Sequence, residues 1–284
     1  MGISPPDDPF LIRFGFLGFE GIRWYGAIIM GGAMIAAFFT ARRAQARGYD
    51  PDHVWNQLML GLIMGIAGAR LYYVFFEWER FAPNPWSIPD LRTGGLAIHG
   101  AIIGAVLSLV VYSRWNKLPL PDWSDTCVPG FMLGQSIGRW GNFFNQEAYG
   151  RPTDLPFGVI IDPVYRVPPF TDLGQYPPDT LFHATFLYES LWNLAGVGVL
   201  LWLDRRFGHG APKGQRHLRP GDLMLVYLII YSLGRFWIEG LRIDSLYAGE
   251  LRMAQVISIV FVLIGALGLF LNHWRRPARS APAA

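Results

Sequence analysis

Six ionisable residues lie inside long apolar stretches of this 284-residue chain: Arg70, His99, Arg139, Glu189, Arg235 and Glu239. In a membrane helix, a charged side chain at mid-depth costs about 2.5–3.5 kcal/mol on insertion scales, so such residues are rare unless they pair or function. A buried guanidinium keeps its charge and can bind an anion, and an imidazole can accept a proton near neutral pH. Both kinds of chemistry are available to this set.

The spacing of three residues places them on one helical face. Tyr231, Arg235 and Glu239 are four residues apart in turn, which brings their side chains to the same side of a helix. A pair that only neutralises itself fits Arg235 and Glu239 as well as a functional pair does. That alternative does not account for Arg139 and His99.

The elements that carry these residues are predicted to cross a membrane. The chain is 52% hydrophobic and 16% charged, whereas soluble domains carry about 25% charged residues. Three stretches without any charge are long enough to span a bilayer: Trp24–Ala41, Thr93–Ser113 and Met253–Asn272. Four further spans with a few polar residues are expected near Val54–Phe76, Asp125–Phe143, Thr185–Leu203 and Leu223–Leu241. Buried helices of a soluble protein are the alternative, and the length and number of the stretches disfavour it.

Basic residues predict the orientation of the seven spans. Thirteen of the 24 lysine and arginine residues follow the first, third, fifth and seventh spans. Because basic loops stay cytoplasmic, the N-terminus is expected outside and the C-terminus inside. The net charge of +3 then reflects topology, so no nucleic-acid partner is expected. No cleavable signal peptide is expected either, because Met1–Phe10 is acidic and rich in proline.

This orientation gives each polar residue a depth in the bilayer. All six fall in the outer half, which predicts one polar site open to the outer leaflet. The segment from about Trp140 to Phe182, between spans four and five, is long and rich in proline and aromatic residues, which favours an ordered periplasmic cap. The expected fold is therefore an all-α integral membrane protein. It forms a single multi-pass domain over residues 1–284, with a cap insertion at about 140–182.

Several other motifs point to packing and not to chemistry. Gly134 to Gly138 matches the G-x-S-x-G pattern of hydrolases, but Ser136 lies in an apolar span where the required strand-to-helix turn is not expected. Gly61 with Gly65, and Gly100 with Gly104, have GxxxG spacing and predict close helix packing. No metal or organic cofactor is expected, since there is no cysteine–histidine metal set, P-loop or paired acidic motif.

The segment Gly138-Arg139-Trp140-Gly141-Asn142-Phe143-Phe144-Asn145-Gln146-Glu147-Ala148-Tyr149-Gly150 resembles the signature G-R-x-G-N-F-x-N-x-E-x-x-G of bacterial prolipoprotein diacylglyceryl transferases, and every fixed position matches. Further similar motifs are Ile22–Gly26, Gly94–Gly100 and Tyr231–Arg235 with Glu239. The resemblance covers essentially the whole chain. One departure is His183–Glu189, where the family often has proline and glutamine.

The resemblance implies an enzyme of the bacterial plasma (inner) membrane whose active site faces the periplasmic side. Its partners would be phosphatidylglycerol, as the diacylglyceryl donor in the surrounding membrane lipid, and the signal peptide of a prolipoprotein. The acceptor would be the thiol of the lipobox cysteine. The product would be a thioether, with glycerol phosphate as the leaving group.

Roles follow from this reaction for the residues that match. His99, Arg139 and Arg235 are the expected catalytic residues, with His99 as the base and the arginines at the departing phosphate. A histidine that only packs between helices is the alternative for His99. The residues expected to bind or position substrate, or to shape the loop, are Tyr25, Asn142, Asn145, Glu147, Gly150, Tyr188, Glu189, Tyr231 and Glu239.

Two other functions remain to be weighed. A transporter or lipid-binding membrane protein would often show inverted repeats and a site at mid-depth, and the sequence shows neither. An intramembrane hydrolase would use Ser136 as its nucleophile, so replacing Ser136 by alanine separates that reading from the transferase.

Overall fold

The computed structural model describes residues 2–6, 8–16, 19–91, 94–212, 216–245 and 247–274. The chain forms two compact units. One comprises Met1–Ala36 with Val128–Ala284, and the other comprises Ala37–Cys127. Helices α1 (Trp24–Ala46) and α5 (Leu120–Phe144) each contribute one end to either unit.

Seven helices of 18 to 25 residues run through the described part of the chain. Besides α1 and α5 they are α2 (Asp52–Phe76), α4 (Ile98–Trp115), α6 (Thr185–Phe207), α7 (Asp222–Glu239) and α8 (Met253–Trp274). Each coincides with one of the predicted spans. Within the described residues, α1, α2, α4, α6 and α8 are long and apolar enough to cross a membrane. The chain is therefore a mostly helical, multi-pass membrane protein.

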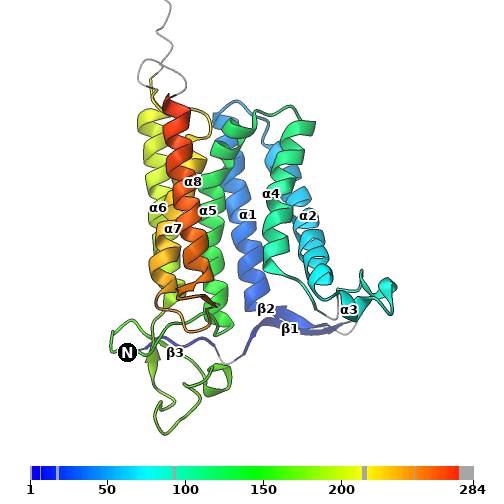
Figure 1. Ribbon diagram of the computed structural model, residues 1–284, viewed down its shortest axis with the longest axis vertical. Coiled ribbons are helices and arrows are strands. Elements are labelled where there is room, and N and C mark those ends of the chain that lie inside the picture. The colour runs from blue at the N-terminus through cyan, green and yellow to red at the C-terminus, as the bar shows by residue number, and fades with distance from the viewer. Residues whose placement is uncertain are drawn as a thin grey trace, which may run out of the picture. The chain divides into compact units, whose positions relative to one another are not determined.

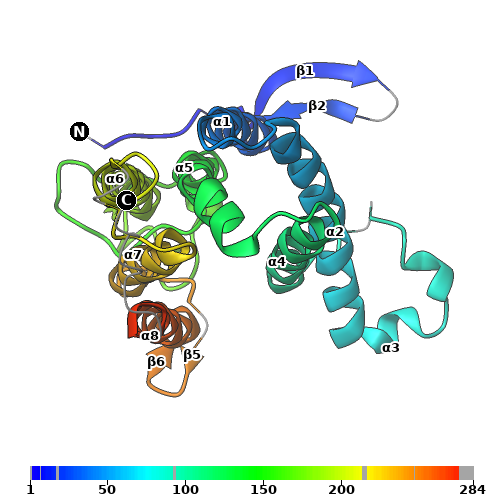
Figure 2. The ribbon, with the colours of Figure 1, turned by 90° about the horizontal axis from the view of Figure 1, so that it is seen from above.

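In the first unit, α6, α7 and α8 lie side by side with α5 (Figures 1 and 2). Helix α7 packs against both α6 and α8. The apolar core between α5, α6 and α7 contains Met132, Leu200, Leu223 and Tyr227, all of which are buried. These contacts fix the three helices that carry Arg139, Glu189 and Arg235.

The segment between α5 and α6 is ordered and has a core of its own. Strands β3 (Val159–Ile160) and β4 (Leu181–Phe182) pair antiparallel, and η2 (Pro163–Tyr165) lies between them. Tyr149, Ile161, Phe182 and Phe186 are among the buried residues of this core.

Two further hairpins were not predicted from the sequence. Strands β1 (Phe10–Phe16) and β2 (Phe19–Arg23) precede α1, and β5 (Tyr247–Ala248) and β6 (Leu251–Arg252) join α7 to α8. The β5 and β6 strands are only two residues long, too short to show an alternating pattern. The all-α description therefore holds for the spans, while short β-hairpins occur in the connections.

In the second unit, α2 packs against α4, and α3 (Trp78–Phe81) and η1 (Pro85–Ser87) lie in the connection between them. A β-carbon added to Gly104 would collide with the carbonyl oxygen of Met64, and one added to Gly100 would collide with that of Gly68. The two backbones are thus in direct contact, which confirms the close packing that the GxxxG spacing predicts.

Three predicted boundaries were wrong by about five residues. The first span extends beyond Ala41, and α1 ends at Ala46. Helix α4 begins at Ile98 and not near Thr93, because Gly94 and Gly95 have φ angles of 74° and 82°, which no right-handed helix can contain. Thr93 itself lies outside the described residues. Helix α5 begins at Leu120, ahead of the predicted Asp125.

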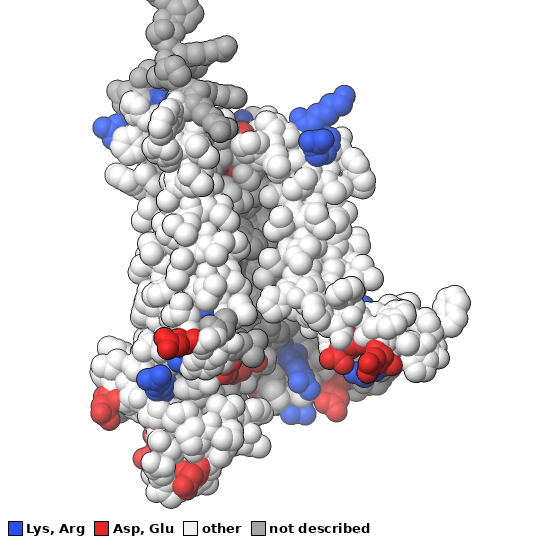
Figure 3. Space-filling model, in the orientation of Figure 1, with Lys and Arg blue, Asp and Glu red and all other residues white. Residues whose placement is uncertain are grey.

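The helical surfaces are uncharged along most of their length. Figure 3 shows this for the face over α6 and α8 and, separately, for the face over α4, with Lys, Arg, Asp and Glu gathered near the helix ends. Large apolar side chains point outward in between, such as Leu263 and Leu267 on α8 and Ile102 and Val106 on α4. Apolar surface of this extent requires a lipid solvent.

The close contact between α2 and α4 gives a stability prediction. Alanine normally stabilises a helix over glycine by about 0.5–1 kcal/mol. In Gly104→Ala the new methyl group must push the two backbones apart, so we expect a loss of about 1–3 kcal/mol, measured by thermal unfolding in detergent with circular dichroism. Gly198→Ala on α6 is the matched control, because a β-carbon there meets nothing within 4 Å. Equal stability of the two variants would contradict the packing.

Candidate functional site

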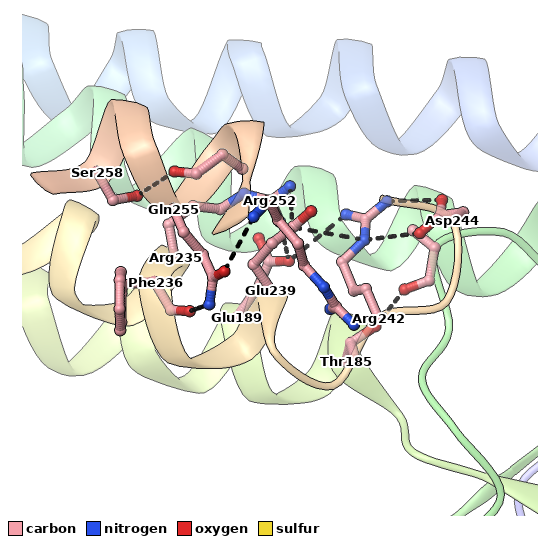
Figure 4. Close-up of polar contacts among 12 residues, drawn as sticks. Thr185, Glu189, Arg235, Phe236, Glu239, Arg242, Asp244, Arg252, Gln255 and Ser258 are labelled. Carbon is pink, nitrogen blue, oxygen red and sulfur yellow. Dashed lines mark hydrogen bonds and ion pairs between the residues drawn. The ribbon is translucent and has the colours of Figure 1, made fainter. Parts of the chain in front are cut away.

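The ends of α5, α6 and α7 bring four of the predicted polar residues together. Glu189 on α6 accepts both arginines: its Oε2 lies 2.7 Å from Arg139 Nη2, and its Oε1 lies 2.9 Å from Arg235 Nη1. Arg235 also reaches Glu239 one turn away on α7, with 2.6 Å between Nη2 and Oε2. Figure 4 shows Arg235 between the two carboxylates. Glu189 thereby positions two guanidinium groups that come from different helices.

A third arginine completes this polar cluster. Arg242, in the segment after α7, forms two hydrogen bonds with Asp244, at 3.0 Å and 2.8 Å. Its guanidinium also lies 3.9 Å from Glu189 Oε1 and 3.9 Å from Glu239 Oε2 (Figure 4). We call Arg139, Arg235, Arg242, Glu189, Glu239 and Asp244 the arginine–carboxylate cluster. Its three positive and three negative charges balance.

Burial differs between the two kinds of side chain in this cluster. The Glu189 and Glu239 side chains are only 5% and 4% exposed, while those of Arg139 and Arg235 are 22% and 18% exposed. The carboxylates are therefore more deeply buried than the guanidinium groups, which remain partly accessible to an anion. Glu239 Oε2 is paired with Arg235 Nη2 at 2.6 Å and lies 3.9 Å from Arg242 Nε.

The turn after α5 holds three more of the predicted residues. Asn142 and Asn145 both donate their side-chain amides to Glu147 Oε1, at 2.9 Å and 3.3 Å. The backbone N–H of Glu147 in turn donates to the carbonyl of Asn142 at 3.0 Å. Glu147 is exposed, so these contacts orient a carboxylate and two amides at the surface of the turn.

Gly150 joins this turn to two other elements. Its N–H donates to the carbonyl of His183, just before α6, and the next N–H, of Arg151, donates to the carbonyl of Leu241 beyond α7. A β-carbon at Gly150 would lie 2.7 Å from His183 Cβ and 3.0 Å from the Leu241 oxygen. Gly150 is buried, so the structure supports a role in shaping the loop.

The three predicted tyrosines lie on different sides of this end of the first unit. Tyr25 packs on Gly141, where a β-carbon would lie 2.9 Å from the Tyr25 ring. Tyr188 lies 3.2 Å from His183 Nδ1 through its hydroxyl and stacks on Trp237. Tyr231 stacks on Tyr227, one turn before Arg235.

His99 belongs to the other unit, where it is the second residue of α4. Its ring is exposed and stacks on Tyr72, with 5.7 Å between the centroids. The prediction that all six ionisable residues form one polar site was wrong for Arg70. The Arg70 guanidinium donates to five main-chain carbonyl oxygens in the connection between α2 and α4, so it has no N–H left for a shared site.

Comparison with known proteins identifies the family of this chain. Residues 11–271 match the family model described as prolipoprotein diacylglyceryl transferase. The chain belongs to this family.

Individual relatives cover nearly the whole chain. A protein from Chloroflexus aggregans named phosphatidylglycerol–prolipoprotein diacylglyceryl transferase is 67% identical over 99% of this chain and 95% of its own length. Proteins with the same name are 43% identical in Gloeobacter violaceus, over 99% and 98% of the two chains, and 44% identical in Clostridium novyi, over 90% and 93%.

Membership of a transferase family weighs against the hydrolase and transporter alternatives. The structure adds a local reason. Ser136 lies within α5, is 4% exposed, and donates to the carbonyl of Ser190 at 2.8 Å. A nucleophilic serine needs an exposed hydroxyl on a sharp turn, so Ser136 packs α5 against α6. Within the described residues, no group of three or more His, Cys, Asp or Glu side chains could hold a metal ion.

Three residues that organise this end of the first unit were missed by the sequence analysis. Arg242 lies just beyond the apolar span, and its pairing with Asp244 two residues later was the available signal. Arg166 donates to the carbonyls of Ile161, Tyr176, Pro177 and Pro178 and holds the cap closed on itself. Burial lowers the pKa of the His183 imidazole from its ordinary value, so this ring is neutral at neutral pH.

The geometry of Glu189 gives a prediction for stability. Glu189→Gln keeps the shape but removes the charge that separates Arg139 from Arg235. We expect a loss of about 1–3 kcal/mol in the free energy of unfolding, because breaking a buried ion pair leaves its partners uncompensated. The variant should be compared in denaturant unfolding with Asp8→Asn, which removes an exposed pair with Arg13 and should leave the unfolding midpoint close to that of the parent. A Glu189→Gln variant as stable as the parent would show that the arginines are held by other contacts.

Proposed function

We propose that this chain transfers the diacylglyceryl group of phosphatidylglycerol to the thiol of a lipobox cysteine in an exported prolipoprotein. This is the first step of bacterial lipoprotein maturation. The observation that carries the proposal is the pair of arginines held by Glu189, in a chain 67% identical to a protein with that name. An anion-binding pair inside a membrane protein suits a phospholipid donor.

The reaction replaces one carbon–oxygen bond of the lipid by a carbon–sulfur bond to the peptide. The cysteine thiolate attacks the glyceryl carbon that bears the phosphate, a carbon–sulfur bond forms, and the carbon–oxygen bond breaks. The electron pair leaves on the phosphate oxygen as glycerol phosphate. The diester carries one negative charge and the departing monoester carries more, so groups that bind the extra charge favour the transition state over the ground state.

Arg139 and Arg235 are placed to bind that charge. Both are already oriented by Glu189, so little reorganisation is needed when the lipid phosphate arrives. Both side chains are partly exposed, and a guanidinium can form paired hydrogen bonds with phosphate oxygens. Glu239 and Glu189 act through these arginines, while Tyr25, Asn142, Asn145, Glu147, Tyr188 and Tyr231 bind or position the substrates and Gly150 shapes the loop.

His99 takes the thiol proton in this scheme. A free cysteine has a pKa near 8.5, so at neutral pH most of the acceptor is protonated and needs a base. His99 is exposed at the start of α4 and its ring is oriented by the stack with Tyr72.

The same proposal assigns the membrane topology. All seven long helices cross the plasma membrane, with the N-terminus and the α5–α6 cap on the periplasmic side and the C-terminus in the cytoplasm. Helices α5 and α7 carry Arg139, Arg235 and Glu239, whose charges are paired within the unit, so these helices can also lie in a membrane. The arginine–carboxylate cluster then faces the outer leaflet, where the lipid and the exported peptide meet.

The direct test is transfer by the purified protein. Phosphatidylglycerol labelled in its acyl chains and a peptide containing a lipobox cysteine are the substrates. The expected product is the peptide with a diacylglyceryl thioether, detected by mass spectrometry, together with one glycerol phosphate per peptide. Release of free fatty acid without thioether would instead indicate a hydrolase, and Ser136→Ala should leave the transfer rate unchanged.

Arg139→Lys tests whether charge alone suffices. Lysine keeps the positive charge but loses the planar fork that can bind Glu189 and a phosphate together. Transfer should fall at least about tenfold, or about 1.4 kcal/mol of transition-state stabilisation. Arg151→Lys in the cap is a control, since its side chain is exposed. Parent turnover in the Arg139 variant would show that the fork is not needed.

His99→Asn tests the base. Asparagine keeps one hydrogen bond, so fold and lipid binding should persist while most transfer at neutral pH is lost. Activity should partly return as the pH rises toward the thiol's own pKa, where the peptide ionises without help. The measurement is the pH–rate profile beside lipid binding, with His53→Asn near the start of α2 as control. Full activity at neutral pH would exclude His99 as the base, and loss of both activity and lipid binding at every pH would mark it as structural.

Topology is tested by a reporter fused after Ala284. A reporter that is active only in the cytoplasm should be active, because seven spans from an outside N-terminus end inside. Activity of a reporter that works only outside the plasma membrane would contradict the seven-span arrangement.

A further inference from the structure

Arg70 is a buried arginine that the proposed reaction does not use. It lies on α2, is 5% exposed, and its guanidinium stands over the ring of Phe81. A charged group of this size is costly to bury, and an apolar residue would fill the same volume without that cost. The presence of a charged side chain at this buried position therefore needs an explanation other than filling space.

All of its N–H groups donate to main-chain carbonyls of one connection. Nε donates to Ile88, Nη2 donates to Ser87 and Asp90, and Nη1 donates to Gly94 and Gly95, at distances from 2.6 to 3.1 Å. A guanidinium has five N–H donors, so this arginine is saturated. It draws the carbonyls of Ser87, Ile88 and Asp90 together with those of Gly94 and Gly95, close to the start of α4.

The last two of those carbonyls lead directly into the helix that carries His99. Gly94 and Gly95 both have positive φ angles, and a β-carbon at Gly95 would lie 2.6 Å from Arg70 Nη1. Two residues later the N–H of Ala97 donates to the carbonyl of Ala69, the neighbour of Arg70, at 3.1 Å. The segment that leads into α4 is thereby attached to α2 at two consecutive residues, Ala69 and Arg70.

The histidine ring completes this attachment. His99 follows Ala97 by two residues and stacks on Tyr72, which follows Arg70 by two residues on α2. The His99 ring is exposed and so can meet a substrate. The backbone that precedes His99 is held through the Gly94 and Gly95 carbonyls, which accept from Arg70.

We infer that Arg70 is a positioning residue for the transfer reaction, which acts through His99 by holding Gly94 and Gly95 against α2. The inference rests on the proposed function only in taking His99 as the base. Lysine cannot replace the arginine, because its three donors radiate from one nitrogen and cannot reach five carbonyls spread over the connection. Gly95 is required for the same contact, since any side chain there meets the guanidinium.

The test combines turnover with a measure of local structure. In Arg70→Lys we expect kcat to fall at least about tenfold, with the KM for phosphatidylglycerol within about twofold of the parent. Amide hydrogen exchange should become at least about tenfold faster in peptides covering residues 94–101 and stay unchanged in α6 to α8. Gly95→Ala should show the same pattern. Arg80→Lys is the matched control. Arg80 lies in the same connection, is exposed, and donates one side-chain hydrogen bond to the Tyr73 hydroxyl.

A double variant separates positioning from general loss of structure. If Arg70 acts through His99, Arg70→Lys combined with His99→Asn should be no more than about threefold slower than the slower single variant. Losses that multiply would overturn the inference, as would parent turnover or parent exchange in Arg70→Lys. Full activity of His99→Asn beside a slow Arg70→Lys would also overturn it, while leaving the transferase proposal intact. Failure of the parent protein to transfer lipid at all would refute the proposed function, and the exchange arm would still decide whether Arg70 holds the segment of His99.

Discussion

The mutual neutralisation of arginines and carboxylates at the ends of α5, α6 and α7 is the interaction on which the candidate site depends. An unpaired charge inside an apolar helix is unfavourable, so the charged ends of these three helices are stable when they meet and their charges pair. Glu189 satisfies two arginines at once. The same contacts that make these helices compatible with a membrane also bring two guanidinium groups together, so stability and the proposed anion binding have one structural origin.

The cap and the segment after α7 complete the surroundings of this cluster. Gly150 and Arg151 form backbone hydrogen bonds to the segments beside α6 and α7, and Arg166 gathers four carbonyls of the cap. A backbone without regular structure is tolerated near a membrane only when its polar groups have partners. Buried arginines that donate to carbonyls, Arg166 in the cap and Arg70 in the other unit, provide those partners.

Most of the helical framework and four members of the cluster could be predicted from the sequence, because apolar length and intramembrane charge are local signals. The start of α4 could not, since it depends on the left-handed Gly94 and Gly95. Arg70 was assigned to the site because its depth resembles that of Arg139, whereas its partners are carbonyl oxygens, which no sequence pattern reveals. Arg242 was missed because it follows the apolar span, and strands β3 to β6 were missed because each is only two residues long.

The central claim is that Arg139 and Arg235 favour the charge that develops on the departing phosphate over the charge of the intact lipid headgroup. The most direct measurement is calorimetric binding of glycerol phosphate, the leaving group, compared with glycerophosphoglycerol, the headgroup diester without its acyl chains. The account predicts that the monoester binds at least about tenfold more tightly than the diester, a difference of about 1.4 kcal/mol. In Glu239→Gln the monoester should still bind more tightly than the diester. Equal affinity for the two ligands, or tighter binding of the diester, would contradict it.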